Sequence, residues 1–306
     1  MTYFLLTGSE GLIGGCLSDY LTQAGMPFRR FDLRCSPSQN ILNYNKVTSA
    51  LEGCTGIIHL AGTSRVIAGQ KNPALCLAQN VKATHFLLKA ALQNPYKPWF
   101  LYASSREVYG QQESLPVFED AVLKPMNIYA HSKALAESII FKARQAGLTT
   151  AILRFSNVFG SPFDHPDRVI PAFCRAALEG KTLRVEGLKN IFDFTFVEDV
   201  VRGIASILSI LMSKAENLPP IHLTMGRGIS LQEAATTIIK LANSTSNLEE
   251  MPPRSFDVSQ FYGNPARAKS LLSWAPQFSF EEAITRFLER LRPYLEEPSA
   301  TRKACG

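Results

Sequence analysis

The sequence has no apolar run long enough to cross a bilayer, and its first residues enter an apolar segment without a basic leader. The most apolar helical candidate, residues 200–212, is interrupted by Arg202, Gly203 and serines. We therefore expect no membrane-spanning helix, no targeting segment and no membrane partner.

Paired cysteines and clustered basic residues are also lacking. The cysteines show no metal-ligand spacing and no disulfide pattern, which favours a reducing cytoplasm; they are Cys16, Cys35, Cys54, Cys76, Cys174 and Cys305. No metal is predicted, because His165 lies in a polar turn without a third ligand at a useful spacing. The net charge is +6, but Lys and Arg are scattered, which disfavours nucleic acid and suits a small anionic substrate.

What is present begins with a glycine-rich turn between a strand and a helix. Residues 3–7 form a short apolar run, and residues 12–24 have helical spacing. Gly8 allows the tight turn, Gly11 lets a pyrophosphate approach the backbone, and Gly14 lets helix and strand pack closely. Leu12 and Ile13 open the helix, whose N-terminus faces the anion.

Asp32 follows the second predicted strand, residues 27–31, and lies eighteen residues after Gly14. An acid at this distance accepts hydrogen bonds from the adenosine ribose hydroxyls. A carboxylate there repels a 2′-phosphate, so the sequence favours NAD over NADP. Arg34 weighs slightly against this, because a nearby arginine can accept the phosphate.

Tyr129 and Lys133 share one face of a helix that begins near Asn127. An unperturbed tyrosine loses its proton near pH ~10, and a neighbouring ammonium is expected to lower its pKa. Such a phenol can take a proton from a sugar or alcohol hydroxyl near neutrality. Upstream, residues 100–105 form a buried strand that ends in the hydroxyls of Ser104 and Ser105.

These motifs together resemble the extended short-chain dehydrogenase/reductase family, in particular its nucleotide-sugar epimerases and dehydratases such as the UDP-glucose 4-epimerases. The motifs are Thr7-Gly8-Ser9-Glu10-Gly11-Leu12-Ile13-Gly14, Ser104-Ser105-x-x-Val108-Tyr109-Gly110 and Tyr129-x-x-x-Lys133. The resemblance runs over nearly the whole chain. It implies an α/β fold, with a Rossmann doubly wound parallel sheet and a smaller C-terminal α/β substrate domain.

The same resemblance divides the chain and supplies partners. Residues 1–160 would bind NAD, and residues 161–306 would mainly bind a nucleotide sugar. Segments near 189–203 and 221–226 would cross back between the two domains. A homodimer through two paired helices is expected.

The resemblance also assigns binding residues. On the cofactor side, Asn40 and Ile41 lie beside the adenine, small residues let the cofactor lie against the backbone, and Asn80 fixes the adjoining loop. The strand-end residues concerned are Leu60, Ala61 and Gly62. Lys133 holds the nicotinamide ribose, and Ser105 bonds the reacting hydroxyl. On the substrate side the assigned residues are Asn157, Arg168, Val169, Arg184, Arg254, Asp257 and Phe261. Phe192 stands where many relatives carry a phosphate-binding arginine.

The resulting hypothesis is 4-epimerisation of a UDP-hexose, with Tyr129 removing the proton of the 4-hydroxyl and Ser105 bridging it. Two alternatives stay open. Glu107 is either the acid/base of a 4,6-dehydratase or decarboxylase, or a loop carboxylate paired with Arg106. A protein of another class, a non-catalytic NAD-binding regulator on the same fold, is disfavoured because such proteins usually lose the tyrosine or the lysine.

Overall fold

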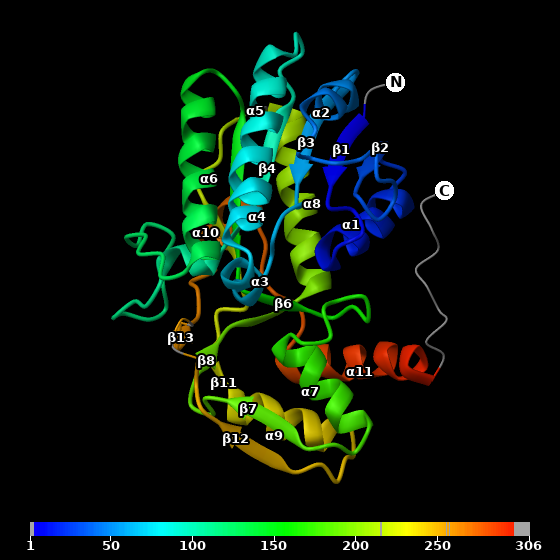
Figure 1. Ribbon diagram of the computed structural model, residues 1–306, viewed down its shortest axis with the longest axis vertical. Helices are drawn as coiled ribbons and strands as arrows, with labels where there is room; N and C mark the ends of the chain where they lie inside the picture. The colour runs from blue at the N-terminus through cyan, green and yellow to red at the C-terminus, as the bar shows by residue number, and fades with distance from the viewer. Residues whose placement is uncertain (1–2, 215, 255, 257, 297–306) are drawn as a thin grey trace.

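The computed structural model describes residues 3–214, 216–254, 256 and 258–296. Its centre is a six-stranded parallel sheet (Figure 1). In spatial order the strands are β10 (Ile221–Leu223), β5 (Thr150–Phe155), β4 (Trp99–Ser105), β3 (Cys54–His59), β1 (Tyr3–Thr7) and β2 (Phe28–Phe31). The order reverses at β1, as in a doubly wound sheet.

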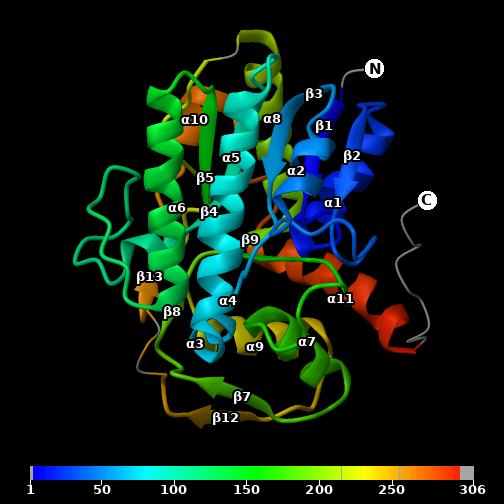
Figure 2. The same ribbon diagram turned by 45° about the horizontal axis from the view of Figure 1, so that its top comes forward.

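Helices cover both faces of this sheet, which explains why the inner strands β4 and β5 are buried along their whole length, whereas the edge strand β2 carries Arg29 and Arg30. Successive residues alternate between faces: Leu6 packs with α1 (Leu12–Gln23) and α8 (Val197–Lys214), whereas Leu5 packs with the helices of the opposite face. Those helices are α2 (Tyr44–Ala50), α5 (Ala83–Gln93) and α6 (Ile128–Gln145). Figures 1 and 2 both show α5 and α6 side by side. The predicted Rossmann-like sheet is therefore confirmed.

Short elements connect these layers. They are α3 (Val66–Lys71), α4 (Pro73–Leu77) and the π-turn η1 (Ala78–Lys82) before α5, the 3₁₀ turn η2 (Arg106–Tyr109) after β4, and α10 (Ala266–Leu272) beside β10. His59 lies inside the core at the end of β3. Its ring nitrogens are 2.8 Å from Thr7 Oγ1 and 3.0 Å from Thr84 Oγ1, and burial lowers its pKa to about 3. It is the satisfied core histidine that its apolar strand predicts.

A second layer lies beyond the carboxyl ends of the strands (Figure 1) and has a separate hydrophobic core. Phe159, Phe196, Phe280 and Phe287 pack edge-on or tilted within it. Its elements are β6 (Asn157–Phe159), α7 (Val169–Leu178), β7 (Leu183–Glu186), β8 (Ile191–Phe192), β9 (Phe194–Phe196), β11 (Ile229–Ser230), α9 (Leu231–Leu241), β12 (Leu248–Met251), β13 (Gln260–Phe261) and α11 (Phe280–Glu296). Residues beyond 160 contribute to both layers, since α8 covers one face of the large sheet and β10 forms its edge strand.

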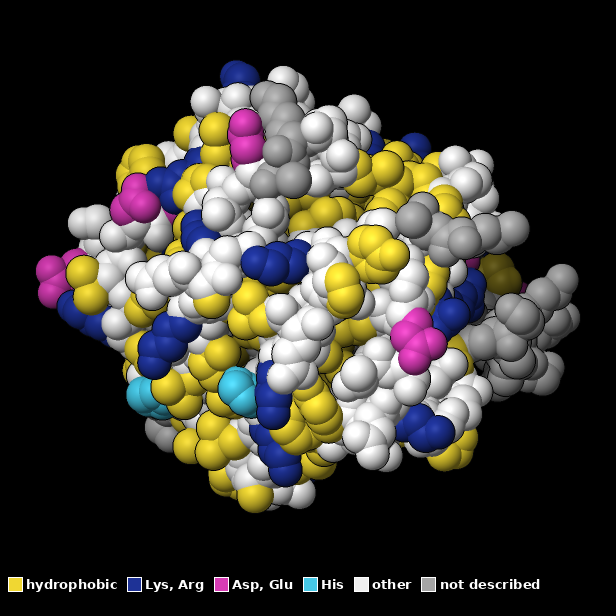
Figure 3. Space-filling model, turned by 90° about the horizontal axis from the view of Figure 1, so that it is seen from above, with side chains coloured by type: hydrophobic (Ala, Val, Ile, Leu, Met, Phe, Trp, Pro, Cys, Tyr) yellow, Lys and Arg dark blue, Asp and Glu magenta, His cyan; other side chains and the backbone are white. Residues whose placement is uncertain are grey.

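Within the described part of the chain, no helix combines the length and apolar character needed to span a membrane. On the face shown in Figure 3, Lys and Arg side chains are dispersed among apolar and uncharged ones. Cys16, Cys54, Cys76 and Cys174 carry reduced thiols. Cys35, by contrast, is disulfide-bonded, so the expectation that the cysteines form no disulfide is wrong at this residue.

Candidate active site

A cavity of about 1170 Å³ opens where the parallel strands end and the second layer begins. Its walls include the residues that follow β1, β2, β3, β4 and β5, together with residues of α7, β7 and β8. The carboxyl edge of a doubly wound sheet is where such folds bind ligands. The cavity brings nearly all of the predicted site residues together.

The glycine turn at one end of the cavity has no room for side chains. Gly8 has φ +72°, and a Cβ there would lie 2.7 Å from the backbone nitrogen of Ala61. A Cβ on Gly14 would lie 2.0 Å from the carbonyl oxygen of Gly8. Gly11 is the N-cap of α1 and supplies no side-chain cap, so the N–H groups that begin at Leu12 and Ile13 are available to an anion. The turn fits the pyrophosphate of a dinucleotide.

Asp32 lies beside this turn and lines the cavity. One carboxylate oxygen accepts a hydrogen bond from Glu10 N (3.0 Å), and the other accepts one from Arg34 N (2.9 Å). The Arg34 Nε is 3.6 Å from the same carboxylate, although most of that side chain is exposed. This part of the cavity wall therefore carries both a hydrogen-bonded carboxylate and a largely exposed guanidinium group.

The other predicted cofactor residues fall into two groups. Five of them line the cavity: Asn40, Ile41, Leu60, Ala61 and Gly62. Asn80 lies behind the wall, 1% exposed. Its side-chain nitrogen donates to Ser132 Oγ (2.8 Å) and to the Thr63 carbonyl (3.1 Å), which ties the loop after β3 to α6.

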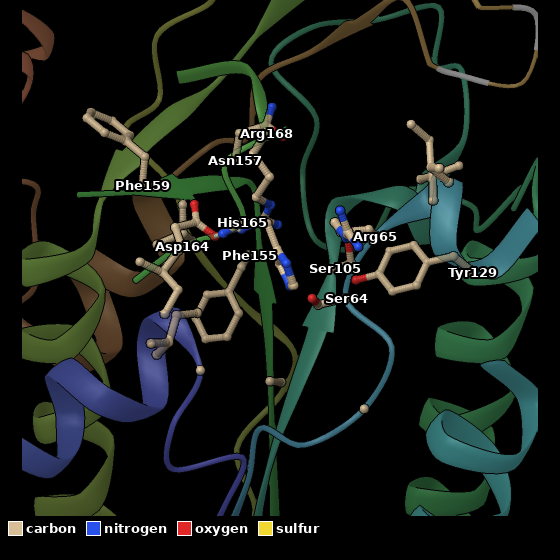
Figure 4. Close-up of a pocket in the computed structure, with 18 of the residues that line it drawn as sticks. Ser64, Arg65, Ser105, Tyr129, Phe155, Asn157, Phe159, Asp164, His165 and Arg168 are labelled. Carbon is tan, nitrogen blue, oxygen red and sulfur yellow. Dashed lines mark hydrogen bonds and ion pairs between the residues drawn. The ribbon is translucent and has the colours of Figure 1, made fainter. Parts of the chain in front are cut away.

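Tyr129 enters the cavity from the first turn of α6, where Asn127 caps the helix by accepting a hydrogen bond from Ala130 N (2.9 Å). Figure 4 shows its hydroxyl pointing toward Ser105 and Ser64. Burial raises the pKa of Tyr129 to about 12; a hydrogen bond with Ser105 and the charge of Arg168 act in the opposite direction, and the charge of Glu107 raises it further.

The prediction that Lys133 lowers the pKa of Tyr129 is wrong. Lys133 Nζ donates to the Ala103 carbonyl (2.8 Å) and lies 4.8 Å above the Tyr102 ring, against 5.9 Å for the Tyr129 ring. Burial lowers the pKa of Lys133 itself to about 8. Helical spacing brought the two residues onto one face, but the ammonium points to the end of β4, and the pKa of Tyr129 is raised where the spacing predicted it would fall.

Glu107 lines the same cavity and is 6% exposed. Its Oε1 is 2.9 Å from Arg106 Nη2, and its Oε2 accepts a hydrogen bond from Asn127 Nδ2 (3.2 Å). Glu107 N also donates to Ser105 Oγ (3.2 Å). The pairing with Arg106 and the position in the cavity are thus both present, and they keep both readings of this residue open.

On the substrate side, Asn157, Arg168 and Val169 line the cavity, as do Arg184 and Arg254. Figure 4 places Asn157 and Arg168 on the side opposite Tyr129. Arg168 Nη1 is 3.4 Å from Asp164 Oδ1. Arg184 and Arg254 come from the β7–β12 end, where their partners are Glu249 (3.1 Å) and Glu186 (2.9 Å).

One predicted substrate residue does not line the cavity, and another lies outside the described residues. Phe261 is 1% exposed and stacks on Tyr109, with ring centroids 6.0 Å apart; it does not line the cavity. Asp257 lies outside the described residues.

The sequence reasoning missed Ser64 and Arg65, which line the cavity near Ser105 (Figure 4). Arg65 Nη1 donates to Asp167 (2.6 Å) across the mouth. Ser64 and Arg65 follow closely after Ala61 and Gly62, and this short distance along the chain could have indicated that they lie at the cavity.

The profile described as "NAD dependent epimerase/dehydratase family" matches residues 4–217, more than half of the chain. The chain belongs to this family. The predicted resemblance to extended short-chain dehydrogenases/reductases is confirmed, and the cofactor of the family is NAD.

Relatives within the family differ in reaction. A UDP-glucuronate 4-epimerase of Thermodesulfobacterium geofontis is 27% identical over 94% of this chain and 95% of its own length. The UDP-glucuronic acid decarboxylase 1 of Danio rerio is 26% identical over 99% of this chain and 78% of its own. MoeE5, solved with NAD and either UDP-glucose or UDP-glucuronic acid, is 26% identical with a TM-score of 0.88. The two structures cover 96% and 95% of this chain and 99% of their own.

Proposed function

We propose that this protein is an NAD-dependent nucleotide-sugar epimerase that inverts the 4-hydroxyl of a UDP-hexose through a transient 4-keto sugar. The observation that carries the proposal is the meeting of Tyr129 and Ser105 in the cavity that also contains the glycine turn. The 4-epimerase relative and the MoeE5 complexes with UDP-sugars support the same substrate class.

The proposed chemistry assigns each polar group one task. Ser105 and Tyr129 hold the sugar 4-hydroxyl between them, and Tyr129 takes its proton and later returns it. When bound, NAD would supply the hydride acceptor for the sugar C4 and the hydride donor for the opposite face of the 4-keto sugar. Lys133, fixed by the Ala103 carbonyl, offers its remaining N–H donors to the nicotinamide ribose. The glycine turn, Asp32 and the residues after β3 would hold the dinucleotide in place during both hydride transfers.

The proposal also assigns the two ligands to different segments of the chain. Residues 1–160, with the returning segments near 189–203 and 221–226, would hold NAD, and residues 161–306 would mainly hold the nucleotide sugar. Arg168, Arg184 and Arg254 would meet the diphosphate and nucleoside, because guanidinium groups match phosphate oxygens in pairs. Asn157 and Val169 would complete that wall. A hexose held more loosely than its nucleotide could then rotate in the site and present its other face to the nicotinamide.

A panel of nucleotide sugars, incubated with the purified protein and NAD, tests this function. Mass spectrometry and proton NMR should find a product of unchanged mass with an inverted C4. Tyr129→Phe should reduce turnover at least ~100-fold, because the general base is lost. Tyr20→Phe, a half-exposed tyrosine on α1, is the matched control and should remain active. Unchanged turnover in Tyr129→Phe would contradict the assignment.

A second candidate is supported by Glu107. A buried carboxylate in the cavity, beside Ser105, suits the additional acid/base of a dehydratase or decarboxylase, and a decarboxylase is among the relatives. In that case the same incubations would release water or carbon dioxide, and Glu107→Gln would abolish the release while Tyr129-dependent oxidation persisted. A mass-neutral product rules this candidate out.

A cytoplasmic homodimer completes the proposal. Cytoplasmic location is proposed because Cys16, Cys54, Cys76 and Cys174 carry reduced thiols; among the described cysteines the disulfide-bonded Cys35 is the exception. Dimerisation is supported by apolar side chains on α6 that face outward, Leu135 (50% exposed) and Phe141 (36% exposed). A non-catalytic NAD-binding role remains the alternative of another class. Turnover with any sugar nucleotide in the panel would exclude it.

A further inference from the structure

A buried arginine stands directly after Ser105, and the proposed chemistry gives it no task. Arg106 lines the cavity and is 8% exposed. Its Nη2 is 2.9 Å from Glu107 Oε1. Its Nη1 is buried and has no hydrogen-bond partner among the described residues. A guanidinium carries only donors, so the group that satisfies Nη1 must be an acceptor.

Two aromatic rings fix where this guanidinium lies. The Arg106 Cζ is 4.7 Å from the centroid of the Phe192 ring and 5.6 Å from that of Phe261. Both rings are buried, so they shield the cation from water and hold its plane. A desolvated donor without a partner is unfavourable in the chain alone. A ligand that brings an anionic oxygen to Nη1 removes this deficit and gains a strong, charge-assisted hydrogen bond.

Arg106 follows Ser105 in the chain, and both residues line the cavity, which favours one part of the sugar as the partner of this cation. Ser105 and Tyr129 hold the 4-hydroxyl in the proposed function, and C6 is carried by C5, the immediate neighbour of C4 in a hexopyranose. The diphosphate is attached to C1, on the far side of the ring. Other guanidinium groups, those of Arg184 and Arg254, line the cavity toward β7 and β12 and suit the nucleotide end.

We infer that Arg106 is a specificity-determining residue that binds the C6 carboxylate of the sugar, so that the substrate class is a UDP-hexuronic acid. The inference rests on the proposed function. Glu107 orients the guanidinium from one side, and Phe192 and Phe261 support it, which leaves Nη1 for the substrate carboxylate. A neutral hexose offers only a 6-hydroxyl there and forgoes the ionic part of the interaction.

The test compares UDP-glucuronic acid with UDP-glucose in wild type, Arg106→Gln and Arg106→Lys. Wild type should favour the uronate in kcat/KM, and Arg106→Gln should lower that preference about 10- to 100-fold, the range of one hydrogen bond to a charged group. Arg106→Lys should fall between the two, since it keeps the charge but loses the planar fork. Arg254→Gln is the matched comparison. It should weaken both substrates by the same factor and leave their ratio unchanged.

Binding provides a second readout that does not depend on turnover. In a Tyr129→Phe background with NAD present, titration calorimetry should find the same loss of uronate preference in Kd on adding Arg106→Gln. A thermal melt of each variant identifies any that fail to fold, and Arg106→Lys then carries the comparison.

Two outcomes would overturn the inference while leaving 4-epimerisation intact. One is a wild-type enzyme that epimerises UDP-glucose as well as UDP-glucuronic acid. The other is an equal loss for both substrates in Arg106→Gln, which would assign Arg106 to the diphosphate. Absence of turnover with every UDP-sugar would instead contradict the proposed function itself.

Discussion

Tyr129 ionises with difficulty in the protein chain alone, because its phenol is buried and its pKa is raised to about 12. A base of this kind needs positive charge close by at the moment of reaction. Lys133 is turned toward Ala103, so Arg168 is the protein cation that acts on the phenol, while Glu107 acts against it. The acidity of the proposed base therefore depends on two charges that face it from different segments.

Opposite shifts of the pH profile follow from these two charges. The acidic limb of kcat rises as Tyr129 loses its proton. Arg168→Gln removes a charge that lowers this pKa, so the limb should move to higher pH; Glu107→Gln removes a charge that raises it, so the limb should move to lower pH. Measurement of kcat at saturating substrate separates this effect from binding. Shifts of the same sign in both variants would contradict the electrostatic account.

At the scale of single residues, short-range patterns were sufficient to place some residues in the cavity and insufficient to place others. Tyr129 was located from its spacing to Lys133 on one helix, Ser105 from its place at a strand end, and Asp32 from its distance to the glycine turn, all of which are local in the sequence. The direction of the Lys133 side chain and the burial of Phe261 depend on contacts with Tyr102 and Tyr109, which lie 31 and 152 positions away along the chain. No pattern within one segment contains that information.

At the scale of elements, the first strand, turn and helix form the most constrained unit of the site. Gly8 and Gly14 contact each other and the loop after β3, so β1, α1 and β3 are locked at one point. This unit could be read from the sequence because glycine is required wherever a backbone passes within van der Waals distance of another. The short strands β6, β8 and β13 offered no comparable signal, since two or three residues carry no measurable periodicity.

Two glycines, one in the first turn of α1 and one just after its end, test this locking. Gly14→Ala places a methyl group 2.0 Å from the Gly8 carbonyl oxygen, so it should cost at least ~2 kcal/mol of unfolding free energy and abolish NAD binding. Gly25→Ala, after the other end of the helix, meets open space at φ +64° and should cost about 1 kcal/mol with NAD affinity retained. Chemical denaturation and NAD titration measure the two effects. Equal NAD affinity in both variants would disprove the close approach.

At the scale of the whole molecule, the two layers divide the cavity between them. The large sheet contributes the glycine turn and the hydroxyl groups, and the second layer contributes Arg168, Arg184 and Arg254. The Arg65–Asp167 pair joins the loop after β3 to the segment before α7 at the mouth of this cavity. The apolar runs of the sequence predicted the sheet. The pairing of Arg65 with Asp167 joins residues 102 positions apart, so only the folded structure could reveal it.

The outer face of α6 is the proposed dimer interface. Leu135 is 50% exposed there, on a helix that lies beside α5 (Figures 1 and 2). An apolar side chain at the centre of a helix-paired interface contributes on the order of 2 kcal/mol to association, and a buried aspartate in its place adds a desolvation cost. Leu135→Asp should therefore weaken dimerisation at least tenfold in sedimentation velocity at micromolar protein. Leu271→Asp, on α10 and 41% exposed, is the matched control and should sediment as wild type does. A monomeric wild type, or a dimer that tolerates Leu135→Asp, would place the interface elsewhere or exclude it.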